Sequence, residues 1–229
     1  MVEYPARRID YREQGSGPTL LFVPGSWSTG ALWRGVIALL GDRFRAVTTS
    51  LLGYGDTEER RTPDDLSIDR EIDVIEAVIQ RTNSDVHLVG HSYGSTVCLA
   101  TALRDRTKIA SMTLIEATPF NLLRHSGDRG LYEQVRAMAD AYVDLLDWSS
   151  ERGFDVPFAA YAGITAPSLL VRGDRSPSAV QRVAKVLSDA VSRSSLVTVP
   201  GASHFMIATH ASDVARLIRE HVATVETLR

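Results

Sequence analysis

Residues 89–95 read Val89-Gly90-His91-Ser92-Tyr93-Gly94-Ser95, and this stretch decides the fold of the chain. An apolar run at 85–89 precedes it, and a run typical of a helix at 95–103 follows it. A strand, a Gly-x-Ser-x-Gly turn and a helix in that order predict a nucleophile elbow, in which a tight turn exposes a serine hydroxyl. Glycine suits both flanking positions because a Cβ there would collide with the neighbouring strand or helix. The stretch therefore predicts Ser92 as a nucleophile that faces the positive end of a helix dipole.

Length and composition indicate a globular protein. The chain has 229 residues, of which 44% are hydrophobic and 23% charged, and its formal net charge is −3. This length suits a single domain over 1–229 with a full core. No long basic block occurs, so the charge gives no support for binding to nucleic acid or to an anionic membrane. We expect a small-molecule substrate as the partner, and a monomer or homodimer.

The first residues, the apolar runs and the single cysteine indicate the cellular compartment. The first residues lack the basic-then-apolar layout of a signal peptide, and no apolar run approaches the roughly 18 residues of a membrane span. Cys98 is the one cysteine, which rules out an internal disulfide. These features favour a cytoplasmic protein. Cys98 itself is expected to be a small core residue.

Apolar runs alternate along the chain with runs of helical period. Strands are predicted at 7–12, 19–23, 45–49, 85–89, 111–115, 168–171 and 196–199, and helices at 31–40, 67–79, 95–103, 130–148, 179–191 and 213–225. This alternation predicts a mostly parallel sheet with helices on both faces. In open sheets of this kind the active site lies outside the carboxyl ends of the strands. The residues that follow each strand are therefore the candidates for a site.

The arrangement resembles the α/β-hydrolase fold in its serine-nucleophile branch, from about residue 19 to the last helix. The resemblance depends on the elbow, on Pro24-Gly25-Ser26-Trp27 after an early strand, and on Pro200-Gly201-Ala202-Ser203-His204-Phe205 after the last strand. The family order of serine, acid and histidine fits Ser92, a later carboxylate and His204. A free hydroxyl is a poor nucleophile and needs a base. The resemblance implies that His204 takes the proton of Ser92 and returns it to the leaving group.

The acid of this predicted triad has two candidates. Many family members carry it in a Gly-x-x-Asp turn, but here Gly173-Asp174-Arg175-Ser176 puts a serine at that place and Asp174 two residues early. Another subset carries it directly after the strand that follows the elbow helix, where this chain has Glu116. We favour Glu116, by fold-level analogy, and keep Asp174 as the alternative. Either residue is otherwise a solvated loop carboxylate or a helix cap.

The resemblance also implies an oxyanion hole. Its two donors would be the backbone N–H groups of Ser26 and Tyr93. No metal is expected, because His87 and His91 lie four apart on a strand and turn rather than on one helix face, and the Glu of the zinc motif is missing. No cofactor is expected, and no glycine-rich phosphate-binding loop occurs after the first strand.

Residues 117–167 form a predicted small cap insertion over the active site, with one helix at 130–148. Trp27, Phe120 and Trp148 are the candidates for the substrate pocket, although Trp27 is equally typical of a core residue. Phe154 and Phe158, also in the insertion, are further apolar candidates. The pocket is therefore expected to take a small to medium, largely apolar substrate.

These features predict a serine hydrolase that cleaves an ester, thioester or lactone through an acyl-enzyme. The same constellation in this family also supports C–C bond hydrolysis, lyase chemistry and cofactor-free perhydrolysis, which the fold cannot separate. An aspartate nucleophile, as in the dehalogenases and epoxide hydrolases of the family, is excluded because position 92 is serine. A non-catalytic, hydrolase-like receptor for a small molecule is the alternative of a different class, and the irregular acid position keeps it open.

Overall fold

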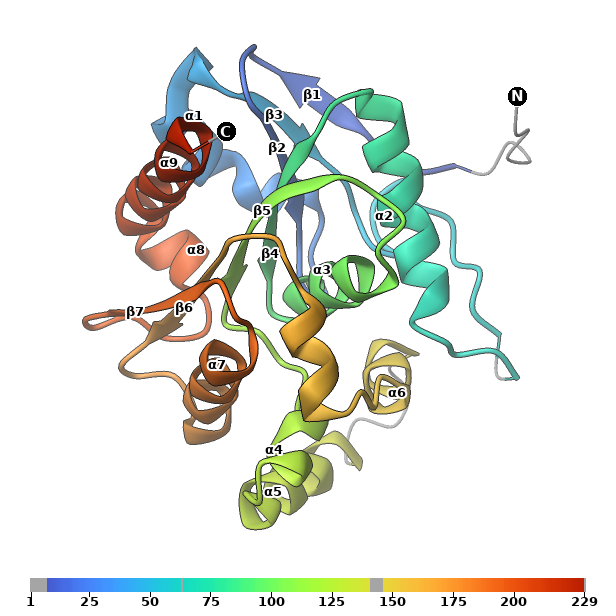
Figure 1. The fold of residues 1–229 in the computed structure, drawn as a ribbon. Coiled ribbons are helices and arrows are strands. Elements are labelled where there is room, and N and C mark those ends of the chain that lie inside the picture. The colour runs from blue at the N-terminus through green and yellow to red at the C-terminus, as the bar shows by residue number, and fades with distance from the viewer. Residues whose placement is uncertain (1–7, 63, 141–145, 229) are drawn as a thin grey trace.

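A computed structural model describes residues 8–62, 64–140 and 146–228 of the chain. A seven-stranded sheet in the order β1-β3-β2-β4-β5-β6-β7 lies at its centre (Figure 1). The strands are β1 (Arg12–Gln14), β2 (Thr19–Val23), β3 (Arg45–Thr48), β4 (Val86–His91), β5 (Ile109–Ile115), β6 (Ser168–Gly173) and β7 (Ser194–Val199). β1 pairs antiparallel with β3, and the other neighbours pair in parallel. The predicted fold class, a mostly parallel sheet between helices, is confirmed.

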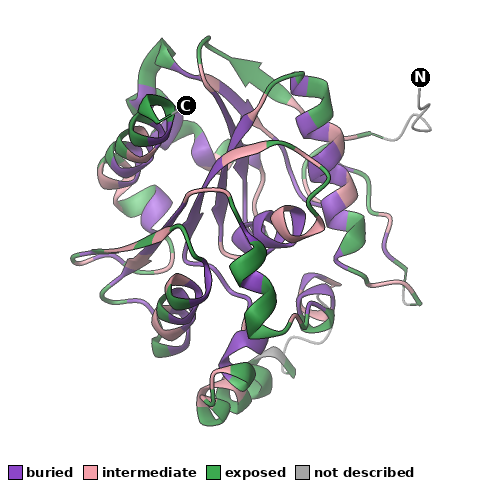
Figure 2. Ribbon diagram, viewed as in Figure 1, coloured by how far each residue is buried: buried purple, intermediate pink, exposed green. Residues whose placement is uncertain are grey.

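Helices cover both faces of the sheet (Figure 1). One face carries α1 (Arg34–Leu40), α8 (Met206–Thr209) and α9 (Ala211–Thr227), and the other carries α2 (Asp69–Thr82), α3 (Tyr93–Arg104) and α7 (Ser178–Ala190). Successive strand side chains enter opposite hydrophobic clusters: Leu20 and Phe22 pack on the α9 side, Leu21 and Val23 on the α3 side. This alternation explains why β2 and β4 are buried along their whole length (Figure 2).

The first predicted strand is misplaced. We expected it at 7–12, of which residue 7 lies outside the described part, whereas β1 begins only at Arg12. Asp10 instead bonds the loop after β3: its carboxylate accepts from Ser50 Oγ at 2.6 Å and its carbonyl accepts from Thr49 Oγ1 at 2.8 Å. The carbonyl of Asp10 is therefore hydrogen-bonded by a side chain, so it does not need a partner strand in the sheet.

The predicted helix at 31–40 begins as a 3₁₀ turn, η1 (Gly30–Trp33), and a further 3₁₀ turn, η2 (Gly41–Arg43), follows α1. The short α8 was not predicted.

The insertion at 117–167 holds more than the single helix that we expected at 130–148. Its described parts contain α4 (Asn121–His125), α5 (Arg129–Asp140), α6 (Leu146–Gly153) and a 3₁₀ turn, η3 (Phe158–Gly163). Residues 141–145 lie outside the described part, so the course of the chain between α5 and α6 is not stated. α5 is mostly exposed, whereas α6 buries Asp147, Ser150 and Glu151 against the core. These buried residues anchor α6 to the body of the protein.

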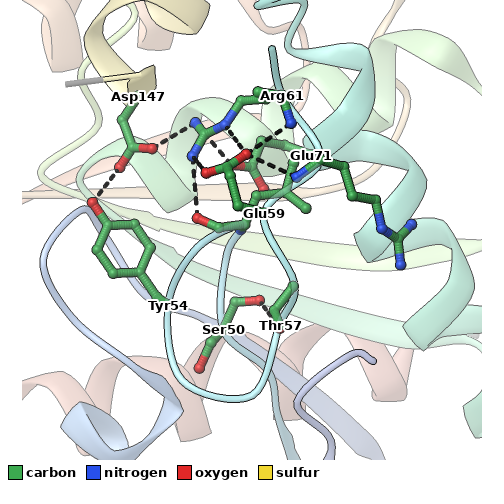
Figure 3. Close-up of polar contacts among 9 residues, drawn as sticks. Ser50, Tyr54, Thr57, Glu59, Arg61, Glu71 and Asp147 are labelled. Carbon is green, nitrogen blue, oxygen red and sulfur yellow. Dashed lines mark hydrogen bonds and ion pairs between the residues drawn. The ribbon is translucent and has the colours of Figure 1, made fainter. Parts of the chain in front are cut away.

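A buried ionic cluster holds α6 to the body of the protein (Figure 3). The guanidinium of Arg61, 2% exposed, lies 2.6 Å from Asp147, 2.7 Å from Glu59 and 3.3 Å from Glu71. The hydroxyl of Tyr54 donates to the second oxygen of Asp147 at 2.9 Å. Burial raises the pKa of Glu71 to about 8, because Arg61 offsets the loss of solvation only in part. Arg61 is therefore the cation that makes burial of these carboxylates tolerable.

Replacing Arg61 by methionine is expected to lower the free energy of unfolding by about 3–5 kcal/mol, because Asp147 would stay buried without a counter-charge. The measurement is equilibrium denaturation in urea. The matched control is Arg70→Met, which removes an exposed pair with Asp65 and is expected to cost no more than about 1 kcal/mol. Equal losses in both variants would show that the cluster does not stabilise the fold.

Candidate active site

Ser92 lies at the tip of the turn between β4 and α3, at φ 53° and ψ −128°. The turn leaves no room for side chains at its glycines: a Cβ on Gly94 would lie 2.3 Å from the carbonyl oxygen of Pro24, and one on Gly90 2.7 Å from the Cα of Ser95. The N–H of Ser92 donates to the carbonyl of Ile115 at 2.9 Å. The strained backbone of Ser92 is thus fixed by the strands on either side, as the sequence predicts for an elbow.

Two residues from distant loops meet Ser92. His204, between β7 and α8, places its Nε2 3.0 Å from Ser92 Oγ. Its Nδ1 lies 3.3 Å from an oxygen of Glu116, which directly follows β5 and is fully buried. The other oxygen of Glu116 accepts from the N–H of Gly173 at 2.7 Å. The result is a line of hydroxyl, imidazole and carboxylate, in which Nε2 can take the serine proton while the carboxylate holds Nδ1–H.

Asp174, the alternative acid, lies elsewhere. It is exposed, and its Oδ1 accepts from the N–H of Gly201 at 2.7 Å, in the loop that carries His204. The turn at Gly173 packs tightly on that same loop, since a Cβ there would lie 2.1 Å from the carbonyl oxygen of Ala202. Asp174 therefore braces the His204 loop, and Glu116 is the carboxylate that contacts the imidazole.

His91 is a site residue that the sequence did not predict. Its buried ring lies 2.7 Å, through Nε2, from the backbone carbonyl of His204. Burial lowers the pKa of His91 to about 4, so near pH 7 the ring is neutral and Nε2–H donates to that carbonyl. His91 thus fixes the backbone beneath His204 rather than competing with it for Ser92. The only signal in the sequence was its position next to Ser92.

The two predicted oxyanion donors flank Ser92. Gly25 packs against the serine so closely that a Cβ on it would lie 2.8 Å from Ser92 Cβ, which brings Ser26 alongside. Ser28 Oγ donates to the carbonyl of Gly25 at 2.7 Å and closes this loop. Tyr93 is the first residue of α3, and the first N–H groups of a helix have no acceptor within it. Ser26 and Tyr93 line the same cavity as Ser92, and their N–H groups remain the predicted donors to an oxyanion at the serine.

A cavity of about 490 Å³ adjoins Ser92 and His204. The three predicted pocket residues Trp27, Phe120 and Trp148 line it, with Phe120 and Trp148 stacked at 6.3 Å between ring centroids. Trp27 is 64% exposed and is not a core residue. Of the other two candidates, Phe154 packs in the core, and neither Phe154 nor Phe158 lines this cavity.

Two polar residues that the sequence did not predict, Thr118 and Glu151, line the same cavity. Thr118 lies two residues after Glu116, and this closeness in sequence was the only feature that could have identified it as a cavity residue. Glu151 lies 59 residues beyond Ser92 on α6, and nothing local marks it.

Several other predicted features have structural explanations. Within 8–62, 64–140 and 146–228, no group of three or more His, Cys, Asp or Glu residues is arranged to hold a metal ion. His87 lies in the interior of β4 and forms a hydrogen bond with Ser111 at 2.8 Å.

Cys98 is fully buried, and burial raises the pKa of its thiol, so it is a core residue and not a nucleophile. No helix in the described part is both long and apolar enough to cross a membrane.

Comparison with known proteins agrees with this architecture. A profile of the "Alpha/beta hydrolase family" matches residues 20–217. The chain is 25% identical to 2-(acetamidomethylene)succinate hydrolase of Mesorhizobium japonicum, over 86% of this chain and 85% of that protein. It is 31% identical to haloalkane dehalogenase 2 of Mycobacterium bovis, over 47% of this chain and 37% of that protein.

Solved structures share the fold. A thermophilic esterase from Thermogutta terrifontis superposes with a TM-score of 0.75 at 17% identity, over 98% of this chain and 96% of that one. A meta-cleavage product hydrolase from Pseudomonas fluorescens IP01 superposes with a TM-score of 0.74 at 21% identity, over 94% of each chain.

Proposed function

Because the chain belongs to the alpha/beta hydrolase family, we propose that it is a serine hydrolase that cleaves an ester, thioester or lactone through an acyl-enzyme. The observation that carries this proposal is the continuous line from Ser92 through His204 to Glu116, with separations of 3.0 and 3.3 Å. A hydroxyl becomes a nucleophile when an adjacent base takes its proton and a third group orients that base. The site has all three groups in that order.

The proposed reaction has two halves. His204 Nε2 accepts the proton of Ser92 as Oγ attacks the carbonyl carbon, and the negative oxygen that forms is met by the backbone N–H groups of Ser26 and Tyr93. His204 then gives the proton to the departing alcohol or thiol, which leaves an acylated Ser92. A water molecule then gives a proton to His204 and attacks this ester, and His204 returns the proton to Ser92 Oγ as the acid is released. Glu116 stabilises the imidazolium at each transfer.

The cavity supports a substrate of small to medium size. Its volume of about 490 Å³ and its aromatic lining suit a compact apolar acyl or alcohol group. No lysine or arginine is among the described residues that line it. The relative from Mesorhizobium japonicum is named for a succinate derivative, a dicarboxylate. Since this cavity offers no cation to such a group, we do not extend that substrate to this chain.

A panel of p-nitrophenyl esters, thioesters and lactones with short acyl chains tests the proposal. We expect saturable hydrolysis of at least one ester, with a burst of p-nitrophenol equal to the enzyme concentration if deacylation is slower than acylation. Haloalkanes should not be dehalogenated, because the nucleophile is a serine. Absence of turnover across the panel, together with an unreactive Ser92, would favour the receptor alternative.

A further inference from the structure

Among the described residues that line the cavity, Glu151 is the one carboxylic acid. Glu151, on α6, is 8% exposed and lines the cavity together with Ser92 and His204. Thr96 Oγ1 donates to it at 3.1 Å, and the hydroxyl of Thr118 forms a second hydrogen bond with it. Both partners are neutral. The mechanism proposed for ester hydrolysis does not use this group.

Among the described residues, no basic side chain forms an ion pair with Glu151. Its neighbour Arg152 bonds Asp140 at 2.8 Å, and Arg61 is committed to the ionic cluster at Asp147. Arg136 and Arg152 line a small adjoining cavity with Glu151, but no ion pair joins either of them to it in the described part of the chain. Burial, with a smaller contribution from Asp147, therefore raises the pKa of Glu151 to about 8, although the hydrogen bonds from Thr118 and Thr96 lower it in part. A buried carboxyl without a cation is costly unless a ligand supplies one.

A second polar group lies in the same wall. The hydroxyl of Tyr93 is buried and has no hydrogen-bond partner among the described residues, and Tyr93 lines the cavity. Its pKa is raised by burial and by neighbouring carboxylates that include Glu151. The stacked rings of Phe120 and Trp148 line both the main cavity and the adjoining one, as Glu151 does. Aromatic faces beside a carboxylate attract a positively charged nitrogen.

We propose that Glu151 is a substrate-binding residue that selects a substrate carrying a positively charged nitrogen, held between the carboxylate and the aromatic rings of the cavity. This inference rests on the proposed function, since it places the substrate in the cavity beside Ser92. It accounts for a buried acid with only neutral partners, and for a cavity whose described lining residues include no lysine or arginine. The ligand's charge would complete the ion pair that the protein leaves incomplete.

Three small molecules of similar shape and different charge test this proposal as inhibitors of p-nitrophenyl acetate hydrolysis. They are choline, its neutral carbon isostere 3,3-dimethylbutan-1-ol, and the anion 3,3-dimethylbutanoate. At pH 8.5 we expect choline to have an inhibition constant about tenfold lower than that of the alcohol, and the anion to be the weakest. In Glu151→Gln this preference for choline over the alcohol should disappear. Glu133→Gln, which removes an exposed carboxylate from α5, is the matched control and should retain it.

The pH dependence of choline inhibition in the unaltered protein is an independent test of the proposal. Choline keeps its charge at every pH, whereas Glu151, with its pKa of about 8, must lose a proton to bind it. The inhibition constant of choline should therefore fall as pH rises from 6.5 to 9, while that of the neutral alcohol stays level. The charged or titratable groups around Glu151 are Asp147 on α6, Tyr93 on α3, His91 and His204 in the main cavity, and Tyr132, Arg136 and Arg152 at the adjoining cavity. The same pH series in Glu151→Gln separates the titration of Glu151 from that of these groups, because the variant keeps them and lacks the carboxylate; there the pH dependence of choline inhibition should be lost.

An equal ratio of the two inhibition constants in Glu151→Gln and in the unaltered protein would overturn the inference, as would tighter binding of the anion. Absence of turnover across the whole panel, p-nitrophenyl acetate included, would count separately against the proposed function. The same three molecules can then be compared by the rise in melting temperature that they cause, which reports binding without turnover. Melting curves also establish that Glu151→Gln is folded before its inhibition constants are compared.

Discussion

Replacing Ser92 by alanine is expected to lower kcat, on the best ester of the panel, by at least about 10⁴-fold. Without the hydroxyl, no acyl-enzyme forms, and only the residual effect of binding and of the oxyanion donors remains. The fold should be unchanged, because the N–H of Ser92, which donates to Ile115, is kept. Steady-state rates and a melting curve are the measurements.

Ser95→Ala is the matched control for this variant. Ser95 lies in the same turn, and its hydroxyl donates to the carbonyl of Ile115 at 3.2 Å, away from His204. Its loss should cost about 1 kcal/mol of stability and less than about tenfold in kcat. A Ser92→Ala variant that keeps rates close to those of Ser95→Ala would remove the nucleophile from this site.

The second large effect is expected from Glu116→Gln, which should lose at least about a hundredfold in kcat. The N–H of Gly173 donates to one oxygen of Glu116, so the glutamine oxygen is held there and its NH₂ group turns toward His204. Nδ1 would then have to accept, and the proton would sit on Nε2, where it blocks proton transfer from Ser92. The amide thus fixes the wrong tautomer and also removes the charge that stabilises the imidazolium.

Asp174→Asn is the comparison for the acid, and it should lose less than about tenfold. Its side-chain oxygen can still accept from Gly201, so the His204 loop keeps its brace. Both variants need melting curves before rates are compared. The reverse order, with Asp174→Asn inactive and Glu116→Gln active, would move the acid to the later loop and contradict the geometry at His204.

The sequence predicted the features that depend on local chemistry. The elbow follows from two glycines around Ser92, and the alternation of apolar strands with helices predicted the sheet. It could not decide between Glu116 and Asp174, because both follow strands that end at the same edge of the sheet. The choice depends on the backbone at Glu116, at φ 54°, and on its bond to Gly173, 57 residues later. No local pattern encodes either of these.

The errors have a similar origin. The early strand was misplaced because Asp10 bonds a loop some 40 residues away instead of joining the sheet. A single cap helix was expected because apolar spacing continues from 130 to 148, yet α6 is held separately by Asp147 against Arg61, 86 residues earlier. Glu151 and His91 were missed for the same reason. Burial, which determines their protonation and partners, is set by segments that are remote in sequence.

Labelling with a fluorophosphonate probe tests the central claim most directly, because the probe reacts with an activated serine whatever the natural substrate is. We predict one label per chain, located by mass spectrometry on the peptide that contains Ser92, and no label on Ser92→Ala. Labelling should slow in Glu116→Gln and remain close to the unaltered rate in Asp174→Asn. A folded protein that takes no label at Ser92, or a Ser92→Ala variant that is labelled as before, would contradict the assignment of this residue as the nucleophile.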